Sequence, residues 1–203
     1  MRTWHILGTL AAILFLAGTL MLHSAPEAIA VLDDAAAALV APLQASAGLA
    51  FFLAMTALGG GAGIAAAAGG FGWGARLSMP RGPRRAALLA APAVACRFLK
   101  ELFERMRPEP LPWFDVLTTA SYPSAHAASA MALYGFIAVV LYSRTKRAAF
   151  AFIPLAAVLL VGMSRVVLNA HYVSDVAAGY LLGIVMLSLA FALPFERLAE
   201  RYG

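Results

Sequence analysis

The chain is made up largely of apolar runs that are long enough to cross a lipid bilayer. A helix needs about 18 or more predominantly apolar residues to cross the hydrocarbon core. Hydrophobic residues make up 63% of the 203 residues and charged residues only 12%, which is too little charge for the surface of a soluble domain. We therefore predict an all-α, polytopic six-helix transmembrane bundle that forms one domain over residues 1–203. Its predicted spans are residues 5–22, 46–70, 85–106, 125–142, 149–168 and 174–194.

The distribution of Lys and Arg predicts the orientation of the bundle. Basic residues cluster between the second and third spans, between the fourth and fifth spans, and in the C-terminal tail, whereas residues 23–45 contain none. Basic loops are retained on the cytoplasmic side of a membrane. We therefore expect both termini to be cytoplasmic and residues 23–45, 107–124 and 169–173 to face outward.

Two segments near the N-terminus leave alternatives open. Arg2, the apolar run over residues 6–22 and the small residues after it are typical of a cleaved signal peptide or of a retained first helix. We favour retention, because further apolar helices follow and can pack against this one. Residues 26–44 interleave apolar and acidic side chains, which fits an amphipathic helix on the outer surface or a plain connecting loop.

Other features exclude several classes of site. The net charge of +5 does not indicate nucleic-acid binding, because the basic residues lie in short loops between apolar runs. Cys96 is the only cysteine and lies in an apolar run, so we expect a buried, inert thiol, no disulfide and no thiolate metal site. The glycine-rich segment 56–63 lacks the Lys-Ser/Thr pair of a phosphate-binding P-loop, and we assign it to helix–helix contacts.

Charged residues at the end of the third span need an explanation, because charge is costly in a membrane helix. Lys100 and Arg107 are seven residues apart, which returns them to nearly the same helical face. Pro108 then ends the predicted helix and leaves Arg107 at the outer surface. Taken alone, the pattern also fits cations that extend from an interfacial helix end toward the headgroups.

A Pro-Ser-Ala-His sequence stands directly before the fourth span. Ser124 is well placed as an N-cap after Pro123, so we expect the free backbone N–H groups of Ala125 and His126 to point at the outer water boundary. A helix N-terminus of this kind favours an anion. An ordinary interfacial histidine is the alternative interpretation of His126.

The turn between the fifth and sixth spans contains a histidine and a carboxylate. Arg165 lies near the outer end of an apolar span, and His171 and Asp175 are four residues apart, so their side chains would meet on one helical face. A carboxylate against one ring nitrogen fixes the imidazole tautomer and makes the other nitrogen more nucleophilic. In the alternative interpretation the pair only ties the loop to the helix.

The topology predicted from charge places these three clusters at one depth of the membrane. Three cations, a helix N-terminus and two histidines at one face describe a site for a phosphoryl group, whereas a transporter usually places its cations near the midplane. A His–Asp pair facing a second histidine is what covalent phosphoryl transfer requires. The residues concerned are Lys100, Arg107, Ser124, His126, Arg165, His171 and Asp175.

In order and spacing the clusters resemble the three-part signature of the type-2 phosphatidic acid phosphatase superfamily. The motifs span residues 100–175, and the six-span pattern extends the resemblance over nearly the whole chain. The family usually has glycine where this chain has Ala125; the backbone N–H is retained, but the methyl group leaves less room for the phosphate. The matching residues are Lys100-x6-Arg107-Pro108, Pro123-Ser124-Ala125-His126 and Ser164-Arg165-x5-His171-x3-Asp175.

The resemblance implies a division of roles among these residues. His171 would attack phosphorus, Asp175 would orient His171, and His126 would act first as an acid and then as a base. No metal ion or other cofactor is implied, since acidic residues are sparse at the outer face and cations take the place of a metal. The residues implied to bind the phosphate are Lys100, Arg107, Ser124, Ala125 and Arg165.

These expectations describe a metal-independent enzyme in the bilayer that hydrolyses the phosphate or pyrophosphate of a lipid at the outer face. Undecaprenyl pyrophosphate, phosphatidylglycerol phosphate, phosphatidic acid and lipid A 1-phosphate all fit as substrates. The alternatives are a lipid phosphotransferase and a non-catalytic phospholipid-binding or transport protein. The alanine-rich, arginine-biased composition is typical of bacteria, so we expect the inner membrane, with the site facing the periplasm or the outside.

Overall fold

The computed structural model describes residues 2–44, 48–74, 83–109, 111 and 119–192, and the side chains of residues 72–74 and 83–86 are not described. These residues contain helices and no strand, which confirms the all-α prediction. The helices are α1 (Arg2–Ser24), α2 (Pro26–Gln44), α3 (Leu49–Gly59), α4 (Gly61–Gly74), α5 (Pro83–Phe103), α6 (Ala125–Thr145), α7 (Ala148–Val167) and α8 (Val173–Ala192).

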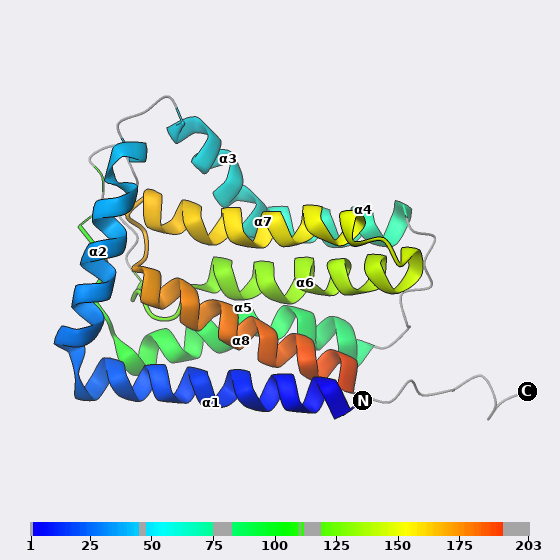
Figure 1. The fold of residues 1–203 in the computed structure, drawn as a ribbon, viewed down its shortest axis with the longest axis horizontal. Helices are drawn as coiled ribbons and strands as arrows, with labels where there is room; N and C mark the ends of the chain where they lie inside the picture. Colours follow the sequence, from blue (N-terminus) through cyan, green and yellow to red (C-terminus); the bar gives the residue numbers. More distant parts are fainter. Residues whose placement is uncertain (1, 45–47, 75–82, 110, 112–118, 193–203) are drawn as a thin grey trace, which may run out of the picture.

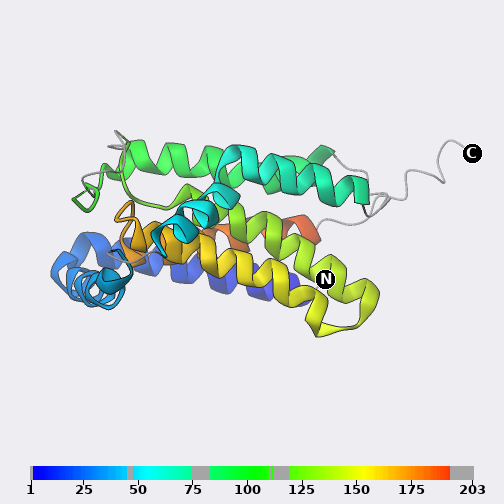
Figure 2. The same ribbon diagram turned by 90° about the horizontal axis from the view of Figure 1, so that it is seen from above.

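Five long helices form the bundle, and α2 crosses one of its ends. The axes of α1, α5, α6, α7 and α8 are roughly parallel, with α6 and α8 running in the opposite direction to α1, α5 and α7, and both views show α2 at the end where α1 stops and α8 starts (Figures 1 and 2). Helix α6 packs against α5, α7 and α8, and most of its first half is buried. The bundle end under α2 therefore joins the ends of several helices that are far apart in sequence.

Small residues let α6 and α8 approach each other closely. A Cβ atom at Gly179 would lie 2.5 Å from the Ser124 carbonyl oxygen, and one at Gly183 would lie 2.6 Å from that of Ala128. The Ser124 N–H donates to the Asp175 carbonyl at 3.0 Å. Close backbone approach at small residues is typical of packed membrane helices. It holds the N-termini of α6 and α8 together.

Not every predicted span is a single straight helix. Of the described helices, α1, α6, α7 and α8 are each long and apolar enough to cross a membrane, and α3 with α4, bent by 66° relative to each other, is either a broken fifth span or a re-entrant loop. Helix α5 is not among them, because its last two turns carry Arg97, Lys100 and Glu101. The count of six spans and the cytoplasmic placement of the termini stay predictions.

Glycines break the predicted span over residues 46–70. Gly60 has an extended backbone (φ −74°, ψ 164°) and separates α3 from α4. Gly59 packs so closely against Val161 of α7 that a Cβ atom would overlap it, and the same Cβ would lie 3.2 Å from the His126 ring. The predicted helix–helix contact is therefore present at Gly59. The break beside it was not predicted.

The third span ends earlier than predicted. Helix α5 stops at Phe103, because Glu104 adopts a left-handed conformation with φ 45°. The prediction that Lys100 and Arg107 share a helical face is therefore wrong, since Arg107 lies in the non-helical segment after α5. Residues 26–44 form the helix that was one of the two alternatives for that segment, and its location on the outer surface stays a prediction.

Candidate active site

The residues singled out in the sequence gather at the end of the bundle that α2 crosses. This end contains the last turns of α5 and α7, the first turns of α6 and α8, and the connecting residues 104–109 and 119–124 (Figure 1). His126 interacts electrostatically with Arg165, His171, Lys100 and Arg107. The fold thus brings the three sequence clusters into one site.

His171 lies in a tight turn between α7 and α8 that fixes both of its ring nitrogens. The backbone N–H groups of Ala170 and His171 donate to the Arg165 carbonyl at 3.0 and 3.1 Å. Its Nδ1 lies 3.5 Å from Oδ2 of Asp175, and its Nε2 lies 3.2 Å from Nη1 of Arg107. A guanidinium only donates, so Nε2 must accept and the ring proton must be on Nδ1. The ring lone pair that can act as a nucleophile is therefore on Nε2.

His171 is kept neutral by its surroundings. Its side chain is 3% exposed. Burial lowers the pKa of His171 from 6.5 to about 4, the Asp175 carboxylate opposes this shift, and Arg165 and Arg107 add to it. A neutral imidazole retains its lone pair for nucleophilic attack near neutral pH.

The Asp175 carboxylate is fully buried and has a complete set of hydrogen-bond donors. Its Oδ2 accepts from the Ser121 hydroxyl and, at 3.0 Å, from the Tyr172 N–H. Its Oδ1 accepts from Nη1 of Arg105 at 2.6 Å. A buried carboxylate needs partners of this kind to remain charged. Asp175 is therefore fixed in the position in which Oδ2 faces His171.

Two of the predicted phosphate-binding cations are tied to the backbone of residues 119–120. Lys100 donates to the Ala120 carbonyl. Arg107 donates from Nε to the Thr119 carbonyl at 2.7 Å and from Nη2 to the Ala120 carbonyl at 3.1 Å. Carbonyl acceptors orient both cations without neutralising their charge. The positive charge stays available to an anion.

Arg165 is the third predicted cation and is almost fully buried, with 3% exposure. Its Nη1 donates to the Thr56 hydroxyl of α3. Its buried Nε has no hydrogen-bond partner among the described residues. A buried guanidinium N–H without an acceptor is rare in a native structure and calls for an explanation. An anion bound at this point would supply the acceptor.

The first turn of α6 places the remaining predicted residues. Ser124 is the N-cap, as predicted, and its hydroxyl accepts from the Ala127 N–H at 3.5 Å. The hydroxyl retains a hydrogen that it can donate to another group. His126 lies beside the break between α3 and α4, where a Cβ atom at Gly60 would be 3.6 Å from its Nε2. The glycine break therefore leaves space next to this ring nitrogen.

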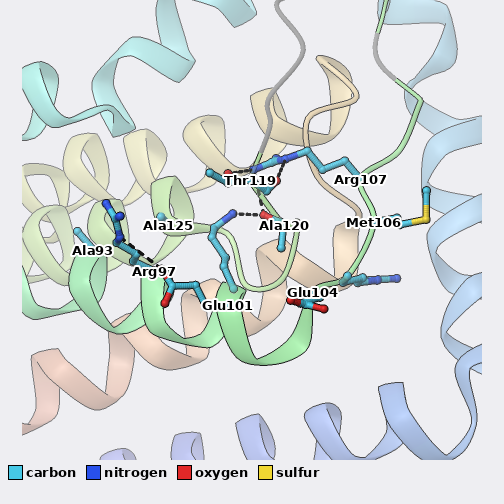
Figure 3. A pocket seen from close by; sticks show the side chains of 11 residues that line it. Ala93, Arg97, Glu101, Glu104, Met106, Arg107, Thr119, Ala120 and Ala125 are labelled. Carbon is cyan, nitrogen blue, oxygen red and sulfur yellow. Dashed lines mark hydrogen bonds and ion pairs between the residues drawn. The ribbon is translucent and has the colours of Figure 1, made fainter.

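A cavity of about 720 Å³ adjoins the site. Figure 3 shows Arg107, Thr119 and Ala120 on one side of the cavity, Arg97 and Glu101 along α5, and Glu104 just after the end of that helix. Lys100 and Ala125 also line it. Cavities of this volume accommodate small ligands or headgroups. Among the described residues, no three His, Cys, Asp or Glu side chains gather as a metal site would require.

Several residues of the site were not predicted from the sequence. Arg105 forms ion pairs with both Asp33 and Asp175. The Ser121 hydroxyl donates to Asp175, and the Thr56 hydroxyl accepts from Arg165. Ser121 and Arg105 adjoin motif residues in sequence, which is the signal that was available for them. No local pattern marks Asp33 or Thr56, since both reach the site only through the packing of α2 and α3.

The comparison with known families decides the classification. Residues 85–199, more than half of the chain, match the family model described as PAP2 superfamily. The chain belongs to the PAP2 superfamily. This confirms the resemblance inferred from the motifs. Because four of the described helices are each long and apolar enough to cross a bilayer, this PAP2 member is an integral membrane protein.

Two relatives of this PAP2 member have informative names. Phosphatidylglycerophosphatase B of Bacillus subtilis (strain 168) is 36% identical over 99 residues, which are 46% of this chain and 48% of that protein. The chain thus spans about half the length of this curated relative. The crystal structure of a transmembrane PAP2 type phosphatidylglycerolphosphate phosphatase from Bacillus subtilis has a TM-score of 0.77 and 23% identity, with 91% of this chain and 94% of that chain covered. That likeness supports the shared fold.

Proposed function

We propose that this PAP2 member is a membrane phosphatase that releases phosphate from a lipid through a phosphohistidine at His171. The observation that carries the proposal is the placement of the His171 ring, whose Nδ1 lies 3.5 Å from Oδ2 of Asp175 while its Nε2 lies 3.2 Å from Nη1 of Arg107. A non-catalytic binding site would need the cations but not this histidine–carboxylate pair. Family membership and the named relatives also support hydrolysis of a phosphate ester.

The first step forms the phosphoenzyme. Nε2 of His171 attacks phosphorus in line, and the bond between phosphorus and the oxygen of the lipid breaks. Arg107 moves its N–H group from Nε2 to a phosphoryl oxygen as the substrate binds. Asp175 stabilises the positive imidazole that results, and His126 donates a proton to the departing lipid oxygen.

The second step releases inorganic phosphate. His126, now without its proton, takes one from a water molecule, and the oxygen of that water attacks phosphorus. The N–P bond breaks and returns its electron pair to Nε2 of His171. Both histidines are then in their starting states, and one water molecule has been consumed.

The phosphoryl oxygens are bound by charge and by N–H groups. We assign the unpartnered Nε of Arg165 to one oxygen, and Lys100 and Arg107 to the others. The Ser124 hydroxyl and the Ala125 N–H at the start of α6 complete the set. Preorganised donors of this kind are the largest contribution in many phosphoryl-transfer sites.

The substrate is a phosphorylated lipid, and phosphatidylglycerol phosphate is our first candidate because of the names of both relatives. Undecaprenyl pyrophosphate, phosphatidic acid and lipid A 1-phosphate remain candidates. The cavity beside Lys100 and Arg107 provides space for a headgroup. Because the lipid is held in the bilayer, the site lies at the membrane surface.

The proposed arrangement in the membrane has six crossings within one domain. The bent pair of α3 and α4 makes one crossing and α5 makes another, in addition to α1, α6, α7 and α8. The distribution of basic residues supports cytoplasmic termini and a site that faces the periplasm or the outside of a bacterial inner membrane.

A screen of four lipids tests the proposed function. Purified protein in nanodiscs is incubated with each candidate lipid without any phosphoryl acceptor, and free phosphate is measured. We expect release from at least one lipid, with phosphatidylglycerol phosphate turned over fastest. A folded protein that releases no free phosphate but transfers the phosphoryl group of the lipid to an added alcohol is a phosphotransferase. Absence of release from all four lipids would contradict the proposal.

Activity is expected to be independent of divalent metal ions. Cations from Lys100, Arg107 and Arg165 supply the charge that magnesium supplies in other phosphoryl-transfer enzymes. Phosphate release after treatment with EDTA should therefore stay within about twofold of the untreated rate. Restoration of a lost activity by added magnesium would contradict this account.

The pH profile is expected to reflect the low pKa of His171. A group with a pKa of about 4 in the folded protein is protonated only near that pH, so the neutral, nucleophilic form persists well below the pH of 6.5 at which a free histidine titrates. Burial is the main cause of this low pKa, while Asp175 opposes it and Arg165 and Arg107 add to it. On the acid side of the profile, we expect kcat/KM to fall only below about pH 5.

The substrate phosphate also titrates near pH 6, so its ionisation must be measured by phosphorus NMR and divided out of the profile. Loss of the corrected kcat/KM between pH 7 and 6 would show that His171 has an ordinary pKa and would contradict the prediction.

A further inference from the structure

An arginine that the motifs do not include lies between two buried carboxylates at the site. Nη1 of Arg105 is 2.6 Å from Oδ1 of Asp175, and its Nη2 is 2.7 Å from Oδ2 of Asp33. The Asp33 and Asp175 side chains are 1% and 0% exposed, and that of Arg105 is 17% exposed. The Arg105 guanidinium also covers the Tyr172 ring at 4.3 Å from the ring centre. Charge-assisted contacts on three sides hold this guanidinium in one orientation.

Arg105 bonds to the oxygen of Asp175 that does not face His171. Oδ1 receives Arg105, while Oδ2 receives the Ser121 hydroxyl and lies 3.5 Å from Nδ1 of His171. A carboxylate that is held at both oxygens cannot rotate about its last bond. Arg105 therefore determines which oxygen faces His171 and at what angle.

Asp33 joins α2 to the same arrangement. Its carboxylate accepts from the Ser174 N–H at 3.0 Å and from the Ser174 hydroxyl at 2.8 Å, at the start of α8. Asp33 also supplies the negative charge that balances Arg105. Arg105 alone would neutralise Asp175, whereas the set of Asp33, Arg105 and Asp175 keeps a net charge of −1, which stabilises a positive imidazole at His171.

We propose that Arg105 is a positioning residue that acts on His171 through Asp175, and that Asp33 of α2 supplies the balancing charge. The proposal rests on the proposed function, because it assigns Arg105 to the support of the nucleophile. The helix that crosses the end of the bundle thereby contributes to catalysis without contacting the phosphate.

The test removes the charge pair as a unit. Arg105→Gln alone would leave the buried Asp33 carboxylate without a balancing positive charge, which is strongly destabilising. The double variant Arg105→Gln/Asp33→Asn removes both charges and keeps polar groups of similar size, so we expect it to fold. Groups that orient a histidine through a carboxylate typically affect activity about 10–100-fold. We expect kcat for phosphate release to fall by about that factor, with KM changed less than threefold.

Two further variants separate positioning from a structural role. Arg105→Lys keeps one charged donor and should recover part of kcat. Arg144→Gln removes an exposed arginine at the other end of α6 and should match the wild type. A double variant with wild-type kcat would overturn the proposal. The proposal would also be overturned if the loss of activity in the double variant were fully explained by a loss of folded protein, as measured by thermal unfolding.

The ring signals of His171 provide a readout that does not depend on turnover. The chain has four histidines, and the ¹⁵N signals of His171 are assigned by their absence in His171→Ala. We expect one tautomer with the proton on Nδ1 in the wild type. The double variant should keep this tautomer, because Arg107 still donates to Nε2, but its Nδ1–H signal should shift as the Asp175 carboxylate loses its fixed orientation. An unchanged Nδ1–H signal in the double variant would overturn the proposal. Wild-type protein that shows the fixed tautomer but releases no phosphate would contradict the proposed function alone.

Discussion

Replacement of His171 by alanine is expected to abolish phosphate release, with kcat reduced by at least about 10⁴-fold. The nucleophile of a covalent mechanism cannot be replaced by its neighbours, and loss of such a group in other enzymes costs about 10⁴–10⁶-fold. Lys100, Arg107 and Arg165 would still bind the phosphate, so we expect KM to change much less than kcat. Steady-state release of phosphate from the preferred lipid measures both quantities.

A matched control is available in the same chain. His5 is an exposed histidine in α1, and His5→Ala should retain wild-type activity. The folded state of both variants is compared by thermal unfolding and gel filtration. A folded His171→Ala protein with near-normal phosphate release would exclude His171 as the nucleophile.

Replacement of His126 by alanine is expected to reduce kcat by about 10²–10⁴-fold, the usual contribution of a general acid–base group. The size of the loss should depend on the leaving group. A lipid alkoxide needs a proton as it departs, whereas nitrophenolate does not. With nitrophenyl phosphate the first step should therefore be nearly normal, and only the second step, which needs a base, should be slow.

Rapid mixing separates the two steps in His126→Ala. We expect a burst of nitrophenolate equal to one equivalent of enzyme, followed by slow turnover. Equal losses in both steps for both substrates would argue that His126 is needed for the shape of the site and not for proton transfer.

The bounds of the helices that carry the motifs were predicted to within a few residues. The positions at which helices break or end early were not predicted. The predicted span 125–142 corresponds to α6, whose start is marked by the Ser124 N-cap. The break at Gly60 and the left-handed Glu104 lie in segments that satisfy the apolar or helical pattern. Their conformations result from packing against α7 and from the path of the chain after α5, which local patterns do not contain.

The core of the site was predictable because its main pair is local in sequence. His171 and Asp175 are four residues apart, and the start of α8 brings their side chains to within 3.5 Å. Arg105 and Asp33 are 72 residues apart, and acidic residues in an amphipathic segment are ordinarily exposed. Asp33 is buried only because α2 crosses the end of the bundle, which the sequence pattern does not indicate.

The most direct measurement is the location of phosphate on the enzyme during turnover. His126→Ala is mixed with nitrophenyl phosphate, quenched at alkaline pH, where phosphohistidine is stable, and analysed by peptide mass spectrometry. We expect one phosphate on His171, with no such species in His171→Ala. Phosphate on a different residue, or sustained turnover by His171→Ala with no phosphoenzyme in either variant, would contradict it.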